Sequence, residues 1–362
     1  MKEITTLKGI AKALNISIGT VARAIHGKHD INPETKKMVL DKIAELNYRP
    51  NKFARSLSVK NKKKIAVIMP CNSYFWDKVK AGIEFAQHET SYYGIHVKFI
   101  CFERMDAIII SNCIKELRKE KYDGIILVPA GLQNMDNLNE LLGDDLSLCL
   151  LNDDMPGVRR QFYVGPDNLL IGNLAGELIG KFLRRKGKCL VISGADFKSK
   201  KMAEECMQRI KGFEKAVGSE FPEVESDIFT YGMYVDDAYK TTLDRIKKDD
   251  EIVSIYSVDG YLYEVAMAVK ESGRKDIILI GHEISDDVNM LLSENYITAA
   301  ICQNPFLQGY FALTYMVEYL VDRKTPPYDK MFINFNIFTK YNTYGNKNYS
   351  SDIGVWNKWM VQ

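Results

Sequence analysis

Residues 7–25 read LKGIAKALNISIGTVARAI and predict two short amphipathic helices joined by a tight turn. Apolar residues recur in the first half at the spacing of one helical face, as in a helix packed on a small core. These residues are Leu7, Ile10, Ala11 and Leu14. Asn15 tolerates the left-handed conformation in which helices often end, and Ser17 stands where an N-cap accepts a backbone N–H.

The second of these helices has an apolar side and an open side. Val21, Ala24 and Ile25 form the apolar side. The residues left on the open side are Ile18, Gly19, Ala22 and Arg23. A helix that presents small residues and one arginine fits the major groove of DNA, where bulky side chains clash. Taken alone, Arg23 has the alternative of a solvated surface charge.

Charge is divided unevenly along the chain. Residues 1–64 hold 15 Lys/Arg against 5 Asp/Glu, a net charge of +10, whereas the remainder holds 34 against 42, a net charge of −8. A basic N-terminal segment on an acidic remainder indicates a polyanion-binding module joined to a different function. With 362 residues, the chain is long enough for two or three globular domains.

Several classes of protein are disfavoured by the sequence. It has neither an N-terminal signal-type apolar segment nor an apolar run that would span a bilayer, so we expect a cytoplasmic, nucleoid-associated protein without a membrane partner. Seven cysteines, scattered from Cys71 to Cys302, fit reduced thiols better than disulfides. No phosphate-binding glycine loop, nucleophile elbow or zinc-spaced Cys/His set occurs, so we predict no enzyme activity, cofactor or metal.

A third helix is predicted over residues 33–46. Asn32, Pro33 and Glu34 supply an N-cap, a first-turn proline and a first-turn acid. Val39, Ile43 and Leu46 would then close a three-helix core. Residues 48–57, YRPNKFARSL, are basic and compatible with a helix, but too short to form one alone. Two interpretations stay open: a flexible charged linker, or a helix that forms on DNA.

The rest of the chain alternates between short apolar runs and helical patterns. Residues 65–70, IAVIMP, are typical of a buried strand. Further strands are predicted at residues 97–101, 124–128, 147–151, 161–164, 189–193, 228–231, 252–257, 277–281 and 299–302. Helical patterns such as 77–93 and 107–121 separate them, which predicts parallel sheets with right-handed crossovers. So many strands exceed one sheet and predict two α/β lobes.

Six motifs of the N-terminal segment occur in one fixed order. Residues 6–57 match the pattern I-A, V-S-x-x-T-V-S-R, N-G, P-E-T, I-x-x-L-x-Y-x-P-N and A-R-S-L. With these motifs in this order, the segment resembles the DNA-binding head of the LacI/GalR repressors. Because the match is dense and collinear, it is specific, and it implies that double-stranded operator DNA is a partner.

The resemblance implies a set of DNA-contacting residues: Thr6, Ser17, Ile18, Gly19, Thr20, Arg23, Asn51, Ala54 and Leu57. In this set, the residues that would face bases are Ile18, Gly19 and Arg23, and those that would face phosphates are Ser17 and Thr20. The residues that would lie in the minor groove are Asn51, Ala54 and Leu57. Leu57 would be wedged between bases, a use of apolar side chains that kinks DNA. Ala22 replaces the family's usual serine, so direct readout would rest largely on Arg23.

Further motifs follow the predicted strands of the remainder. They are NSYFW (72–76), DMP (154–156), YVGPDN (163–168), RIKGF (209–213), IGHE (280–283) and QNP (303–305). In their order they resemble the sugar-binding, periplasmic-protein-like core of the same repressors. The resemblance implies that the chain crosses between the lobes near residues 163, 291 and 322.

We therefore expect a small all-α helix-turn-helix head plus an α/β periplasmic-binding-protein type I core of two lobes with parallel sheets. The head covers residues 1–48, the hinge helix or linker 49–61, and the core 62–340. Its N-lobe would hold residues 62–163 and 292–322, and its C-lobe 164–291 and 323–340. Residues 341–362 depart from the family pattern.

A ligand crevice is expected at the carboxyl ends of the strands. A sugar needs aromatic faces and planar polar groups, and the candidate contacts are Asn72, Tyr74, Phe75, Trp76, Asp154, Arg209, Asp259, Glu283 and Gln303. Core packing is the alternative for the aromatic residues, and a surface ion pair is the alternative for Arg209. His282 is expected to pack or hydrogen-bond rather than to contact ligand.

Together these features predict a ligand-responsive transcriptional regulator, a repressor of carbohydrate uptake or catabolism genes. It would bind a palindromic operator as a homodimer, with apolar positions around Phe85 at the dimer surface, and hold a sugar-like effector between its lobes. The alternative is a sugar-binding or sugar-processing protein without operator control.

Overall fold

The computed structural model describes residues 7–25, 31–46, 62–71, 73–103, 106–129, 132, 137–194, 204–231 and 235–343. The chain divides near Lys62 into two units, the head and the body, and each is described by itself. The predictions for several residues and segments lie outside the described residues. These are Thr6, Asn51, Ala54, Leu57 and Asn72, the linker over 47–61 and the tail from 344 onward.

The head consists, in the described part, of α1 (Leu7–Ala13), α2 (Ile18–Ile25) and α3 (Pro33–Glu45). Asn15 adopts the predicted left-handed conformation with φ 53°, and the Ile16 N–H donates to the Ala11 carbonyl at 3.0 Å, which closes the end of α1. Apolar side chains from the three helices meet in one small core that includes Ile10, Ala11, Val21, Ala24 and Val39. The predicted three-helix head is confirmed.

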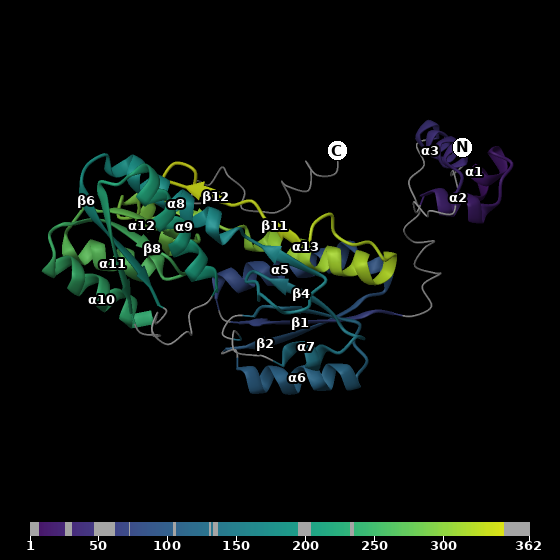
Figure 1. Cartoon of the computed structure of the whole chain (residues 1–362), viewed down its shortest axis with the longest axis horizontal. Helices are drawn as coiled ribbons and strands as arrows, with labels where there is room; N and C mark the ends of the chain where they lie inside the picture. Colours follow the sequence, from purple (N-terminus) through teal and green to yellow (C-terminus); the bar gives the residue numbers. More distant parts are fainter. Residues whose placement is uncertain are drawn as a thin grey trace. The chain divides into compact units, whose positions relative to one another are not determined.

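The first lobe of the body is built on a six-stranded parallel sheet in the order β11-β5-β4-β3-β1-β2. Its strands are β1 (Lys64–Pro70), β2 (His96–Phe102), β3 (Gly124–Leu127), β4 (Ser147–Leu151), β5 (Phe162–Gly165) and β11 (Lys330–Phe332). Its helices are α5 (Tyr74–Glu89), η1 (Ser91–Tyr93), α6 (Ala107–Lys119), α7 (Leu138–Leu142), α13 (Pro305–Val317) and η2 (Glu318–Asp322). Figure 1 shows α5 and α13 over one face of this sheet and α6 and α7 over the other.

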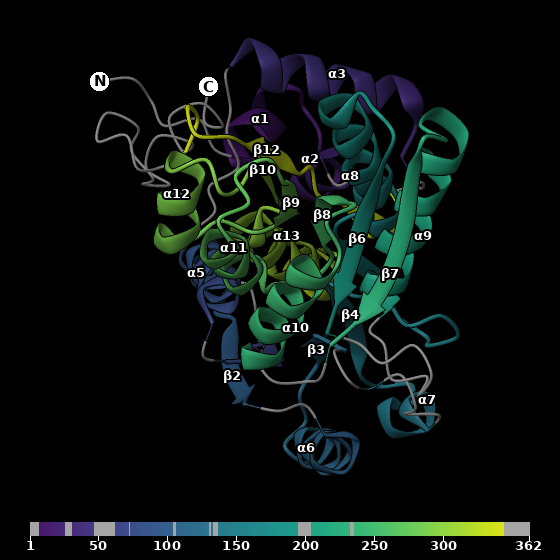
Figure 2. The same cartoon turned by 90° about the vertical axis from the view of Figure 1, so that its left-hand side faces the viewer.

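The second lobe carries another six-stranded sheet, in the order β12-β10-β9-β8-β6-β7, in which only the β10–β12 pair is antiparallel. Its strands are β6 (Gly187–Ser193), β7 (Val224–Thr230), β8 (Ile252–Ser257), β9 (Ile278–His282), β10 (Ala299–Cys302) and β12 (Asn336–Phe338). Its helices are α8 (Asn168–Leu183), α9 (Glu204–Glu220), α10 (Val235–Lys248), α11 (Leu262–Ser272) and α12 (Asp286–Ser293). Buried clusters place α8 and α9 on one face of the sheet and α10, α11 and α12 on the other (Figure 2).

Two of the expected crossings between the lobes are wrong. The first crossing lies between β5 and α8, close to the expected residue 163. However, β10 still pairs within the second sheet, so the chain crosses after Cys302 rather than near 291. β11 pairs with β5 in the first sheet, so the last crossing lies between Phe332 and Asn336 rather than near 322. Strands β11 and β12 have three residues each, too few to leave a periodic pattern.

No helix among the described residues is long and apolar enough to cross a membrane. The seven cysteines all fall in the described part of the chain, and each is a free thiol. This agrees with the expectation of reduced cysteines.

Candidate functional site

The described side chains of α2 lie on the predicted faces, whereas the predictions for Ala22 and Ile25 lie outside the described side chains. Val21 and Ala24 are buried, while Ile18 (46% exposed), Gly19 and Arg23 face outward. Ser17 caps the helix, because its Oγ accepts the Thr20 N–H at 3.0 Å. The head therefore presents a shallow helix face with a single long cationic side chain.

In the body, Arg209 is the central residue of a group of polar side chains in the second lobe. It lies on α9 and is 2% exposed, so the surface ion pair is excluded. Its Nε donates to Asn168 Oδ1 at 2.9 Å, and its Nη1 donates to the Val258 carbonyl at 2.8 Å. Its Nη2 has no hydrogen-bond partner among the described residues. A buried guanidinium with a free donor is arranged to receive an acceptor atom from a ligand.

A hydrogen bond connects this group to the first lobe. Glu205, one turn before Arg209, lies with Oε2 3.9 Å from Arg209 Nη2, and the same oxygen accepts from Asn152 Nδ2 at 3.0 Å. Asn152 directly follows β4. The next residue, Asp153, is buried, and burial together with the charge of Glu205 raises its pKa well above the usual range.

Glu283 and Gln303 form a second polar pair at the ends of β9 and β10. Gln303 Nε2 donates to Glu283 Oε1 at 2.6 Å, and in the described chain Gln303 Oε1 has no partner. Burial raises the pKa of Glu283 to about 7, although the Gln303 hydrogen bond and the charge of Arg209 oppose the shift. The neighbouring His282 is buried and lies 2.9 Å from the Tyr256 hydroxyl, so it hydrogen-bonds as expected.

Asp259 and Asp154 are both committed to protein partners. Asp259 Oδ2 accepts from the Gly194 N–H at 2.6 Å and from the Tyr231 hydroxyl at 2.5 Å. Asp154 accepts two hydrogen bonds from Arg160, at 2.7 and 2.9 Å, and pairs with Lys330 Nζ at 2.9 Å. Burial acts to raise the pKa of Asp154, but the two cations outweigh it and hold the pKa below its usual value.

Asn152, Asp153 and Glu205 are not among the site residues predicted from the sequence. A signal for them was present, because the first two directly follow a predicted strand and Glu205 lies one helical turn before Arg209. Asp154 is the predicted residue of the same loop, yet the charge of Glu205 raises the pKa of its neighbour Asp153, whereas Asp154 pairs with Arg160 and Lys330.

The aromatic candidates follow the carboxyl end of β1. Ser73 caps α5 by accepting the Trp76 N–H at 3.3 Å. Tyr74 is exposed, whereas Phe75 and Trp76 are half-buried and pack edge to face with ring centroids 4.8 Å apart. Both rings thus stay partly accessible beyond the carboxyl end of β1, as stacking on a sugar requires.

Three residues with left-handed backbone lie at the same ends of the strands. Asn152, Glu283 and Asn304 have φ values of 69°, 71° and 53°, and each stands within two residues of the end of β4, β9 or β10. Asparagine tolerates this conformation, so the cost of about 1–2 kcal/mol falls on Glu283.

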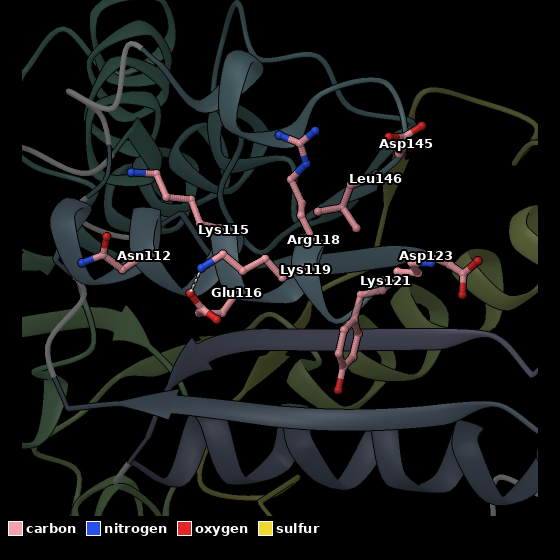
Figure 3. Close-up of a pocket in the computed structure, with 10 residues that line it drawn as sticks. Asn112, Lys115, Glu116, Arg118, Lys119, Lys121, Asp123, Asp145 and Leu146 are labelled. Carbon is pink, nitrogen blue, oxygen red and sulfur yellow. Dashed lines mark hydrogen bonds and ion pairs between the residues drawn. The ribbon is translucent and has the colours of Figure 1, made fainter.

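A hollow of the first lobe lies at the opposite end of its sheet. It has a volume of about 970 Å³ and is lined by residues that precede β3 and β4 or lie on α6, including Asp123, Asp145 and Lys115. Figure 3 shows its lining as mixed charges, among them the Lys119–Glu116 ion pair of 2.7 Å. It is therefore separate from the polar group around Arg209. Within the described ranges, no group of three His, Cys, Asp or Glu side chains is placed to hold a metal ion.

Comparisons with known proteins agree with this architecture. Residues 6–51 match the family described as bacterial regulatory proteins, lacI family, and residues 65–324 match the periplasmic binding protein domain. The HTH-type transcriptional repressor PurR of Mannheimia succiniciproducens is 27% identical over 77% of this chain and 82% of its own. The ribose operon repressor of Halalkalibacterium halodurans is 26% identical over 80% of both chains.

Among solved structures, GanP, a glucose-galactose binding protein from Geobacillus stearothermophilus, superimposes with a TM-score of 0.70. The match has 21% identity and covers 79% of this chain and 100% of GanP, which shows a shared fold. With a helix-turn-helix head on a two-lobed body of this fold, the chain belongs to the lacI family of bacterial regulatory proteins and carries a periplasmic binding protein domain.

Proposed function

We propose that this ligand-responsive, DNA-binding regulator represses genes of carbohydrate uptake or catabolism. It binds a palindromic operator as a homodimer, and a sugar-like effector binds between its lobes. The main support is the buried Arg209, whose free Nη2 lies among carboxylates at the ends of the strands, in a chain that also carries a helix-turn-helix head. The similar ribose operon repressor supports a sugar as the effector class.

Coupling between effector and operator follows from the contact between the lobes. The Asn152–Glu205 hydrogen bond joins them, so a ligand that binds either residue changes how the lobes are held. The effect on DNA binding can be only as large as the ligand's difference in affinity for the two states. We place the protein in the cytoplasm, associated with the nucleoid, without an enzymatic role.

The decisive experiment is a gel shift of the purified full-length protein on DNA upstream of its own gene and of neighbouring sugar genes. We expect binding that weakens with salt, as phosphate contacts require, and that changes when the right sugar is added. Arg209→Ala should abolish the response to sugar and leave operator binding in its absence intact. Turnover of a sugar by the protein, without operator binding, would contradict the proposal.

Base recognition is assigned to Ile18, Gly19 and Arg23, and phosphate contacts to Ser17 and Thr20. An arginine that reads guanine contributes about 1–3 kcal/mol of discrimination, so Arg23→Ala should flatten the preference at one symmetric operator position. Selection of binding sites from a random pool measures this. Lys52→Ala, in the basic linker sequence, is the control and should weaken binding to all sequences alike. An unchanged preference in Arg23→Ala would overturn the assignment.

The homodimer is tested by sedimentation of the free protein and of its operator complex. Phe85, which was expected near the dimer surface, packs on α13 with its ring centroid 5.8 Å from Phe306 and 5.9 Å from Tyr310. The dimer surface is therefore better sought among exposed apolar residues such as Ile108 and Ile109 on α6. An Ile108→Lys variant that remains dimeric would exclude that face.

A further inference from the structure

The junction of the two lobes is rich in hydrogen-bond acceptors. This inference rests on the proposed function and concerns which ligand group the junction receives. We propose that the effector presents a protonated amine to the junction formed by Asn152 and Asp153 of the first lobe and Glu205 of the second. The effector class is then a polyhydroxylated amine, such as an amino sugar.

The orientation of Asn152 is the first argument. Its side-chain nitrogen must face Glu205, because an ionised carboxylate only accepts hydrogen bonds. Its Oδ1 is thereby directed away from Glu205, and it is buried without a partner in the described part of the chain. An unsatisfied, buried acceptor requires a donor, and the ligand is the group that can supply it.

The carboxylates are the second argument. Asp153 is 3% exposed, and its Oδ1 accepts the Asp154 N–H at 3.0 Å, which leaves the other oxygen for a ligand. The pKa of Asp153 is raised because its ionised form is buried and faces the like charge of Glu205. A cation placed between the two side chains would stabilise the ionised form of Asp153 against both effects.

Arg209 supplies positive charge at this junction but donates no hydrogen bond to either carboxylate in the described part of the chain. Its Nη2 forms an ion pair of 3.9 Å with Glu205, and its charge favours the ionised form of Asp153. The Arg209 hydrogen bonds go to Asn168 and Val258 instead. Arg160 and Lys330 are both paired with Asp154. An ammonium group supplies three hydrogen-bond donors and one positive charge. These match the carboxylates of Asp153 and Glu205 and the amide oxygen of Asn152.

Such a ligand would also bind the two lobes to each other. The ammonium group would bond residues of the first lobe and Glu205 of the second at once, whereas a neutral hydroxyl donates a single hydrogen bond. The residues that would select an amine are therefore the same residues through which ligand binding would change the arrangement of the lobes.

The experiment uses matched sets in which only the charge changes. Glucosamine, galactosamine and mannosamine are titrated into the full-length protein by calorimetry and thermal shift, beside their N-acetyl derivatives and the parent sugars. We expect at least one amine to bind about tenfold more tightly than its N-acetyl and parent forms, a difference of about 1.4 kcal/mol. Binding of none of the three amines, or equal binding of amine and parent in every set, overturns the inference.

Variants separate the junction from the rest of the site. Asp153→Asn and Glu205→Gln should each reduce the preference for the amine over its parent sugar, whereas the exposed Asp144→Asn should leave it unchanged. A preference that survives in both junction variants overturns the inference. An amine that binds but leaves operator affinity unaltered refutes the proposed function instead. A neutral sugar that binds best and alters operator affinity refutes only the amine.

Discussion

Glu283 occupies a backbone conformation that only glycine adopts without cost. Glu283 directly follows β9 and has a φ of 71°. Asn152 directly follows β4 and has a similar φ of 69°. A glycine at position 283 would remove about 1–2 kcal/mol of strain, whereas asparagine tolerates the conformation at position 152. The side chain is therefore what Glu283 contributes, and it holds a polar group of the candidate site in place.

The titration of Glu283 makes stability depend on pH. Its pKa is about 7 in the folded protein, against an ordinary value of 4.5. Since the folded state binds the proton more tightly, the stabilisation is fully present below 4.5 and is lost as the pH rises through 7. Lowering the pH from about 8 to about 5 should therefore raise the melting temperature more in the wild type than in Glu283→Gln.

Scanning calorimetry across this pH range checks the prediction, with Asp144→Asn as the control for removal of an exposed carboxylate. The control should follow the wild type. Parallel pH profiles for the wild type and Glu283→Gln would show that Glu283 is not the titrating group.

At the scale of elements, both lobes use the same close crossing of two helices. A Cβ on Gly172 of α8 or Gly212 of α9 would overlap a backbone carbonyl oxygen of the other helix, that of Arg209 or Leu169. Gly82 of α5 and Gly309 of α13 meet the partner backbone in the same way. Because α9 carries Arg209 one turn and Glu205 two turns before its crossing glycine, this backbone contact sets where both charges lie.

Replacing the crossing glycine should affect both stability and binding. Gly212→Ala forces α8 and α9 apart and should destabilise the fold by about 1–3 kcal/mol, in the range of overpacked cores. Since the shift moves Arg209, effector affinity should fall as well. Urea unfolding and calorimetric titration measure the two effects.

Gly218→Ala, two turns further along α9, is the matched control. A Cβ there meets nothing within 4 Å, so the substitution should stabilise the helix by about 0.5–1 kcal/mol. Equal stability of the two alanine variants would show that the helices adapt to the added methyl group.

Elements with continuous burial could be predicted from the sequence, and others could not. Strands β8 and β10 have the predicted bounds, because every one of their residues is buried and apolar patterning is strong. β11 and β12 are short and partly exposed, so they left no pattern. In the site, Arg209 and Glu283 lie in recognisable sequence motifs and could be predicted. The pairing of Asp154 with Lys330 joins segments that are distant in the sequence, so it depends on the fold.

At the scale of the whole body, a hydrogen bond between Asn152 and Glu205 joins the two lobes. Asn152→Ala removes the hydrogen bond between the lobes but leaves the Arg209 contacts to Asn168 and Val258 in place. The ratio of operator affinities with and without effector should then shrink about fivefold or more, within the range of typical allosteric couplings.

A double-mutant cycle of Asn152→Ala and Glu205→Ala tests whether the two residues act through one contact. Gel shifts at saturating effector give the ratio for each variant. The double variant should lose little more than either single one, because interacting residues are not additive. Additive losses would mean that the two side chains act independently.

The last two strands have a consequence for the order in which the protein is made. β11 and β12 lie within nine residues of each other, yet they border different sheets, beside β5 and β10. During synthesis the DNA-binding helices leave the ribosome first, and β5 and β10 are edge strands until this segment emerges to cover them. A message cut short before it would yield a nascent protein with a complete head, in which the normally buried strands β5 and β10 are exposed edges that can aggregate. Premature stop codons in this gene should therefore produce insoluble protein rather than an unregulated repressor.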